Sequence, residues 1–194
     1  MKRKYTIGID EVGRGPLAGP VAVGAVVTTP RMLQKFRDIK ESKQLSAHQR
    51  EVWAARMVAA KNDEFNFAVS FVSPRIIDAK GISFAIRLAL ARSLKKLNID
   101  PPDCTVLLDG GLHAPKEYDS QKTIIRGDSS ETAIAMASVI AKVLRDRVMV
   151  NAGAGFPQYG FREHKGYGTA KHIAAIRKHG LSKIHRVSFC TRIF

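Results

Sequence analysis

The sequence predicts an α/β fold in which a mixed β-sheet is flanked by helices. Three observations support this class: three strand-like apolar runs within the first 72 residues, two more between residues 105 and 125, and amphipathic patterns with a helical period between and after them. The chain has 194 residues, 45% of them hydrophobic, which is enough for one substantial core. We therefore expect a single domain over residues 1–194.

The first half of the chain contains three predicted strands and two predicted helices. The strand-like segments are Tyr5–Asp10, Val21–Thr28 and Phe65–Val72. One helix is predicted over Ser46–Ala60, with Ser46 as its N-cap, and a second over Ser83–Leu97, whose apolar residues fall on one face. A glycine-rich turn, Gly13–Gly15, joins the first two strands.

The second half of the chain predicts two short strands and then helices. The strands are Thr105–Leu108 and Lys122–Ile125. A long helix is predicted over Ser129–Val150, with small and apolar residues suited to close packing. Beyond Gly153 the sequence becomes basic, with aromatic residues and histidines interleaved, and it ends with one more short helix over about Thr169–His179.

The charge of the chain indicates a polyanionic partner. There are 32 lysines and arginines against 17 acidic residues, a formal net charge of +15. Such an excess favours nucleic acid first and an anionic membrane surface second, over a surface charged for solubility alone. No apolar run reaches the roughly 18 residues of a membrane span. No apolar stretch of a signal peptide follows the basic start, so we expect a cytoplasmic protein.

The cysteines and histidines predict no metal or redox site. Cys104 and Cys190 form no CxxC pair, and we interpret them as small apolar residues in a reducing compartment. The six histidines lack the spacing of a metal site, so we expect them at the surface or facing phosphate. The glycines after the first strand do not fit a dinucleotide-binding fingerprint, because Pro16 and a β-rich run follow where a helix is required.

Acidic residues recur where the predicted strands end. Asp10 and Glu11 follow the first strand, Asp109 follows a later one, and Asp128 follows another and begins a helix. Parallel strand ends gather at one edge of a sheet, and carboxylates meeting there repel one another unless cations neutralise them. Mg²⁺ suits such oxygen ligands. Two ions about 3.5 to 4 Å apart can activate a water and stabilise the leaving oxygen of a phosphodiester.

Two alternative interpretations remain open at this point. Asp109 and Asp128 each adjoin a glycine, and such pairs are common turn formers. This interpretation is weaker for Asp10 and Glu11, because neighbouring glycines already supply a turn. The second alternative is a non-catalytic nucleic-acid-binding protein, which accounts for the charge but not for carboxylates that would weaken phosphate binding.

Specific motifs resemble one enzyme family. Residues Gly8–Val21 closely resemble the opening motif of bacterial ribonuclease HII, the type 2 ribonuclease H. Further segments match the family in the same order along nearly the whole chain: Ser42–Ser46, Leu108–Gly110, Gly127–Ser129, Ala137–Val143, Arg145–Arg147, Phe156–Phe161, His164–Thr169, His185–Arg186 and Ser188–Phe189.

The resemblance implies a fold and an activity. The fold is a ribonuclease H-like mixed sheet flanked by helices, with a basic helical C-terminal extension over about residues 151–194 that binds substrate. The activity is a metal-dependent endoribonuclease that hydrolyses the RNA strand of RNA/DNA hybrids. It also nicks DNA duplexes 5′ to embedded ribonucleotides and leaves 3′-OH and 5′-phosphate ends. Two divalent ions, Mg²⁺ or Mn²⁺, are implied, and the expected partners are these duplexes, bound by a monomer.

The resemblance also implies roles for individual residues. The implied catalytic, metal-binding carboxylates are Asp10, Glu11, Asp109 and Asp128. The implied substrate-binding residues are Gly13, Arg14 and Gly15, which sense the ribose 2′-hydroxyl, Tyr167, which stacks on the sugar 3′ to the ribonucleotide, and Lys43, Lys142 and Lys165, which contact phosphate. Three positions depart from the family pattern: Glu41 replaces a usual aspartate, Gln44 a usual lysine and Met136 a usual alanine.

Overall fold

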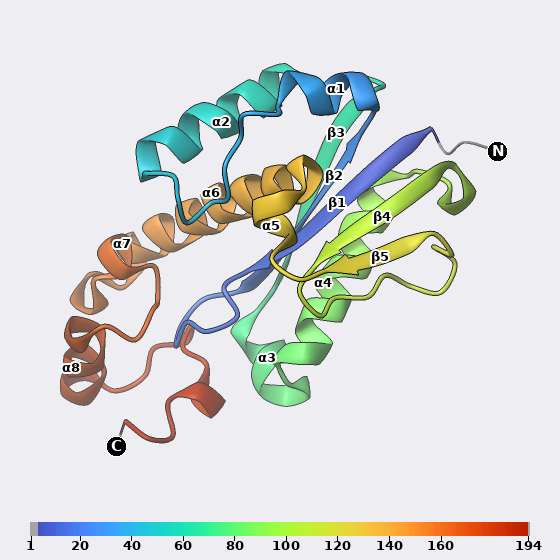
Figure 1. Cartoon of the computed structure of the whole chain (residues 1–194). Coiled ribbons are helices and arrows are strands. Elements are labelled where there is room, and N and C mark those ends of the chain that lie inside the picture. The colour runs from blue at the N-terminus through green and yellow to red at the C-terminus, as the bar shows by residue number, and fades with distance from the viewer. Residues whose placement is uncertain (1–3, 194) are drawn as a thin grey trace.

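The computed structural model describes residues 4–193 and contains one five-stranded sheet in the order β3-β2-β1-β4-β5 (Figure 1). The strands are β1 (Tyr5–Val12), β2 (Val21–Thr28), β3 (Phe65–Val72), β4 (Cys104–Asp109) and β5 (Gln121–Ile124). β1 pairs antiparallel with β2 and parallel with β4; β2 and β3 are antiparallel, and β4 and β5 are parallel. The predicted mixed sheet is therefore confirmed.

Eight α-helices surround this sheet in the described residues. They are α1 (Pro30–Lys35), α2 (Ala47–Ala59), α3 (Pro74–Lys80), α4 (Ile82–Leu97), α5 (Gly127–Ser130), α6 (Thr132–Gly155), α7 (Phe161–His164) and α8 (Ala170–His179). Three short 3₁₀ turns are Pro101–Asp103, Pro157–Tyr159 and Val187–Phe189. The predicted cap of α2 is confirmed, since Gln49 N–H donates to the Ser46 hydroxyl over 3.2 Å and the Ser46 N–H donates to the Gln49 side chain over 2.8 Å.

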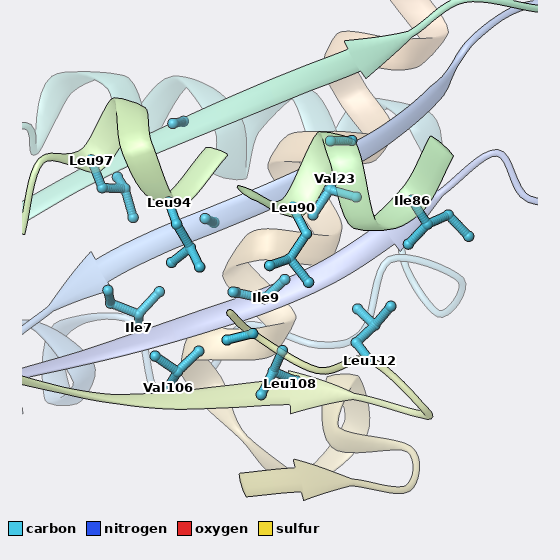
Figure 2. Close-up of a cluster of buried hydrophobic side chains, with 14 of the residues drawn as sticks. Ile7, Ile9, Val23, Ile86, Leu90, Leu94, Leu97, Val106, Leu108 and Leu112 are labelled. Carbon is cyan, nitrogen blue, oxygen red and sulfur yellow. The ribbon is translucent and has the colours of Figure 1, made fainter. Parts of the chain in front are cut away.

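The two faces of the sheet are covered by different helices. On one face α4 packs against the apolar side chains of β1, β2 and β4, and Figure 2 shows Leu90 of this helix above Ile9 and Leu108. On the other face α6 lies so close to the sheet that a Cβ atom on Gly8 would lie 2.1 Å from the main chain of Ala133. The small residues of this helix thus allow the close packing that the sequence predicts.

The long helix predicted over Ser129–Val150 is in fact two helices. α5 ends at Ser130, Glu131 has an extended backbone with φ −119° and ψ 113°, and α6 then continues to Gly155. The prediction was wrong because an apolar pattern does not show a one-residue break. The break leaves Asp128 on its own short helix beside the carboxyl ends of β1 and β4.

Residues 156–193 form what we call the C-terminal layer, which contains α7 and α8 and lies beside the end of α6 and the β1–β2 connection (Figure 1). Its core includes Phe161, Ile176 and Cys190 together with Ala18 and Met149. Both cysteines are buried, and no disulfide joins them in the described residues. Within the described residues, we find no helix whose length and hydropathy would let it cross a membrane.

Candidate active site

A pocket of about 280 Å³ lies where β1 and β4 end, and it gathers almost every residue that the sequence singles out. Of the predicted site residues, the pocket lining contains Asp10, Glu11, Gly13, Arg14, Gly15, Lys43, Asp109, Asp128, Lys142 and Tyr167. Lys165 lines an adjoining groove of about 690 Å³, which shares Lys142 and Tyr167 with the pocket. The convergence predicted from strand ends is confirmed as a placement in space.

The carboxylates are held by regular secondary structure rather than by turns. Asp10 and Glu11 lie within β1, which continues to Val12 because its pairing with β2 extends beyond its pairing with β4. The expectation that they follow the strand was therefore wrong. Asp109 is the last residue of β4, and its Oδ1 accepts a hydrogen bond of 3.4 Å from the N–H of Asp128 in α5.

Burial and repulsion from neighbouring carboxylates favour the neutral forms of Asp10, Glu11 and Asp128. Asp10 is only 6% exposed. Burial, followed by the charges of Asp109, Glu11 and Asp128, raises its pKa to about 8. Burial is also the largest cause that raises the pKa of Glu11 and of Asp128. A cation in this pocket would remove the repulsion and restore the charged forms.

The oxygen-donor set fits hard divalent ions, although the side chains are not closed around one. Within residues 4–193, no three or more acidic, histidine or cysteine side chains form a group that could hold a metal ion as it stands. The four carboxylates nevertheless line one pocket, and the only ion pair recorded among them in the described chain is Glu11 with Arg14 at 3.5 Å. Carboxylate oxygens are the ligands that hard divalent cations prefer.

Basic and aromatic side chains form the rim of the pocket. Lys142 donates a 2.8 Å hydrogen bond to Asp146, one helical turn further along α6, and lies 5.5 Å from the centre of the Tyr167 ring. Tyr167 is 40% exposed, so it is no core aromatic. Lys43 is exposed and also lines the pocket. The Lys165 ammonium donates instead to the main-chain carbonyls of Arg162 and Glu163 in α7.

The two glycines of the turn are required for different physical reasons. Gly13 has φ +87°, and a Cβ atom there would lie 2.1 Å from Nε of Arg145, so the fold requires glycine at this position. Gly15 has no atom within 4 Å of the position that a Cβ would take. Any restriction at Gly15 therefore comes from what enters the pocket.

Sequence reasoning missed two buried arginines behind this turn. Arg145 and Arg186 have no exposed surface, and each donates to main-chain carbonyls of residues 13–20. A signal for Arg145 exists, because Ala137, Ala141 and Met149 place it at i, i+4 spacing within the apolar stripe of α6. Comparable local evidence for Arg186 is absent from the pattern around it.

The histidines of the C-terminal layer correct another expectation. His172 and His185 are buried, at 0% and 3% exposure, rather than at the surface or facing phosphate. Their Nε2 atoms lie 3.0 Å apart, and Nδ1 of His172 lies 2.9 Å from the carbonyl oxygen of Tyr167. The N–H of Ser182 donates to Nδ1 of His185 over 2.8 Å. These rings therefore connect the end of the chain to the Tyr167 loop.

The mixed five-stranded sheet flanked by helices is the ribonuclease H fold, and known structures share it. The ribonuclease H2 from Pyrococcus horikoshii OT3 is 24% identical, with a TM-score of 0.74 over 97% of this chain and 96% of that one. A structure titled Bst-RNase HIII in complex with Mn2+ is 19% identical, with a TM-score of 0.73 over 98% of this chain and 69% of that one.

Sequence comparison identifies the family. The family model described as Ribonuclease HII matches residues 7–192. The Ribonuclease HII of Synechococcus sp. (strain WH7803) is 44% identical over 97% of this chain and 96% of its own length. That of Endomicrobium trichonymphae is 43% identical over 94% of this chain and 83% of its own length. The chain belongs to the ribonuclease HII family, and it is an enzyme, an endonuclease of the ribonuclease H type.

Proposed function

We propose that this enzyme hydrolyses the RNA strand of RNA/DNA hybrids and nicks DNA duplexes on the 5′ side of embedded ribonucleotides, leaving 3′-OH and 5′-phosphate ends. The observation that supports this most directly is the pocket in which four carboxylates lie beneath a basic rim. In a chain with a net charge of +15, such a cluster opposes phosphate binding unless divalent cations occupy it.

In this proposal Asp10, Glu11, Asp109 and Asp128 hold two divalent ions, Mg²⁺ or Mn²⁺. When bound, these ions would supply a nucleophilic water and stabilise the charge on the leaving oxygen. The chain itself contributes position, since two of the ligands lie on β1 and the others on β4 and α5, all anchored to one sheet edge. Because a carboxyl group must be deprotonated to bind a cation, ion binding would release the proton that the raised pKa of Asp10 favours in the empty pocket.

The rim residues hold the substrate in this proposal. Lys43 and Lys142 bind phosphates on either side of the scissile bond, and Lys165 binds a phosphate further along the adjoining groove. The half-exposed Tyr167 ring packs on the sugar that follows the ribonucleotide. A deoxyribose there leaves no polar group unpaired, whereas a ribose would bury a hydroxyl against the ring. The glycine turn, Gly13–Gly15, senses the 2′-hydroxyl, which distinguishes RNA from DNA.

The test uses two labelled duplexes, one all-hybrid and one of DNA with a single ribonucleotide. Each is incubated with the enzyme in Mg²⁺, in Mn²⁺ or with a chelator. We expect cleavage of both with a divalent ion, at the 5′ side of the single ribonucleotide, and none with chelator. Asp109→Asn should abolish cleavage, while Asp38→Asn, an acidic residue 83% exposed and outside the pocket, should not. Metal-independent cleavage, or equal activity in both variants, would refute the proposal.

A further inference from the structure

Two buried cations hold the segment that forms one wall of the pocket. Arg145, on α6, and Arg186, in the C-terminal layer, are fully buried. Buried arginines are expected to pair with acids. Within residues 4–193, however, neither has a carboxylate among its hydrogen-bond partners, and every recorded acceptor is a main-chain carbonyl.

Arg186 uses its three nitrogens on the glycine turn and the residues after it. Its Nη2 donates to the carbonyl of Gly13 over 2.7 Å and its Nη1 to the carbonyl of Arg14 over 3.0 Å. Its Nε donates to the carbonyl of Gly19 over 3.0 Å. Hydrogen bonds from a charged donor are the stronger and more directional kind, so this planar group fixes two consecutive peptide units of the turn.

Arg145 supports the same segment through other carbonyls. It donates to the carbonyls of Pro20, Ala18 and Lys165, over 2.9, 3.3 and 3.1 Å. Its acceptors lie after the glycine turn or in the loop before Tyr167, so Arg145 forms no hydrogen bond with the turn itself. It contacts the turn only by packing against Gly13. Of the two arginines, Arg186 is therefore the one bonded to the turn itself.

The direction of these carbonyls decides where the amide groups of the turn point. The described peptide bonds are all trans, so each C=O and the N–H of the next residue point in opposite directions. Since the carbonyls of Gly13 and Arg14 point inward to Arg186, the N–H groups of Arg14 and Gly15 point outward. Residues 13–15 line the pocket, and in the described chain these two N–H groups donate to no main-chain carbonyl.

We propose that Arg186 is a positioning residue for substrate choice, which holds the peptide units of the glycine turn so that the N–H groups of Arg14 and Gly15 face the 2′-oxygen of the ribonucleotide. This inference rests on the proposed function. It assigns to the C-terminal layer a part in recognising ribose, through a residue that contacts neither substrate nor metal. Arg14 contributes its main chain to this recognition, while its side chain pairs with Glu11.

The test compares binding of two duplexes of the same sequence, one all-DNA and one with a single ribonucleotide. It uses the Asp109→Asn background with Mg²⁺ present, so that cleavage does not intervene. The variant is Arg186→Lys, which keeps the charge but lacks the planar group that reaches two carbonyls. Arg177→Lys is the matched control, since Arg177 is exposed in the same layer and also donates to one main-chain carbonyl, that of Ile193, over 3.2 Å.

We expect Arg186→Lys to reduce the ratio of the two affinities at least tenfold, while Arg177→Lys leaves the ratio unchanged. If Arg186 had only a structural role, Arg186→Lys would weaken the binding of both duplexes equally. The ratio of the two affinities would then be unchanged, and the inference would be overturned. Failure of the proposed function would give a different result. The wild-type enzyme would then cleave no ribonucleotide-containing duplex, and the Asp109→Asn protein would bind both duplexes equally. In that case the inference fails together with the proposed function.

A second measurement needs no substitution at Arg186, so it can be made even if the Arg186→Lys protein does not fold. The amide ¹⁵N–¹H resonances of Arg14 and Gly15 are followed in the Asp109→Asn protein during titration with each duplex. We expect these two signals to shift more with the ribonucleotide duplex than with the all-DNA duplex. Equal shifts with both duplexes would contradict an outward-facing pair that reads the 2′-oxygen.

Discussion

The carboxylate pocket and the C-terminal layer both bury charged or titratable groups, but they differ in the partners that they give to these groups. Asp10 lies among other carboxylates, and its pKa is raised to about 8. Arg186 is equally buried, yet each of its three nitrogens has a main-chain acceptor. The first region is incomplete without a ligand, whereas the second is complete within the chain. In the proposed function, this difference separates residues that take part in the chemistry from residues that hold those groups in place.

The largest expected effect is in the pocket. Asp10→Asn should lower cleavage by at least about 100-fold, because a charged ligand is lost. The metal-free protein should melt at the same or a higher temperature, because the charge is buried and the amide oxygen can still accept the 2.7 Å hydrogen bond from Glu11 N–H. Asp38→Asn is the control for both measurements. A clear fall in Tm would contradict this prediction, because it would show that the Asp10 carboxyl group stabilises the metal-free fold.

The two glycines of the turn should respond in opposite ways. Gly13→Ala forces an L-residue to φ +87° and overlaps Arg145, so it should lower the free energy of unfolding by about 3 kcal/mol. Gly15→Ala meets no atom within 4 Å and should change stability by less than about 0.5 kcal/mol.

On the single-ribonucleotide duplex, Gly15→Ala should still lower kcat/KM at least about tenfold, by keeping the sugar from the turn. Urea unfolding and steady-state kinetics measure the two effects. Full activity in a stable Gly15→Ala enzyme would mean that the substrate does not approach this position.

Acid should act on the C-terminal layer. Burial lowers the pKa of His172 to about 4. Between about pH 6.5 and pH 4, the His172 ring therefore takes up a proton when the protein unfolds. The stability that depends on neutral His172 is complete above about pH 6.5 and decreases towards pH 4, by up to about 3 kcal/mol.

Urea unfolding at a series of pH values would show this loss. His172→Gln should flatten the dependence between pH 6.5 and 4, whereas the exposed His48→Gln should not. Superimposable curves for wild type and His172→Gln would show that this ring does not link folding to protons.

The smallest effect concerns the exposed rim. Lys43 is exposed and lines the pocket, so loss of one phosphate contact in Lys43→Ala should flatten the slope of log K against log salt by about 0.9 unit. Stability should not change. Lys35→Ala, an exposed lysine at the end of α1 outside the pocket, is the control. An unchanged slope would mean that Lys43 does not contact phosphate.

Much of the regular structure could be predicted from local patterns, and the differences have physical causes. β2 and β3 have the predicted bounds, and each is followed by a single N-cap residue and then by a helix that begins at a proline. β1 is two residues longer than predicted, because its pairing with β2 sets its end. The short helices α1 and α3 each begin at a proline and are too brief for a helical period to be visible.

The residues that line the candidate site could be predicted from the sequence, but the buried residues that hold them in position could not. Strand ends and a family resemblance indicate the carboxylates, the turn and Tyr167. The acceptors of Arg186 lie more than 160 residues earlier in the sequence, and a local pattern contains no information on such a contact. The burial of His172 likewise depends on Tyr167 and His185, which supply its hydrogen-bond partners.

The histidine pair also fixes where individual protons lie. A main-chain N–H can only donate, so Nδ1 of His185 carries no proton and its Nε2 does. The facing Nε2 of His172 must then accept, which leaves the proton of His172 on Nδ1, pointing at the carbonyl of Tyr167. Each ring thus has one defined tautomer, and the hydrogen bonds run in one direction from Ser182 to Tyr167. An added proton on His172 sets two N–H groups against each other across 3.0 Å. An added proton on Nδ1 of His185 faces the N–H of Ser182 across 2.8 Å, so either proton breaks the chain that anchors the Tyr167 loop.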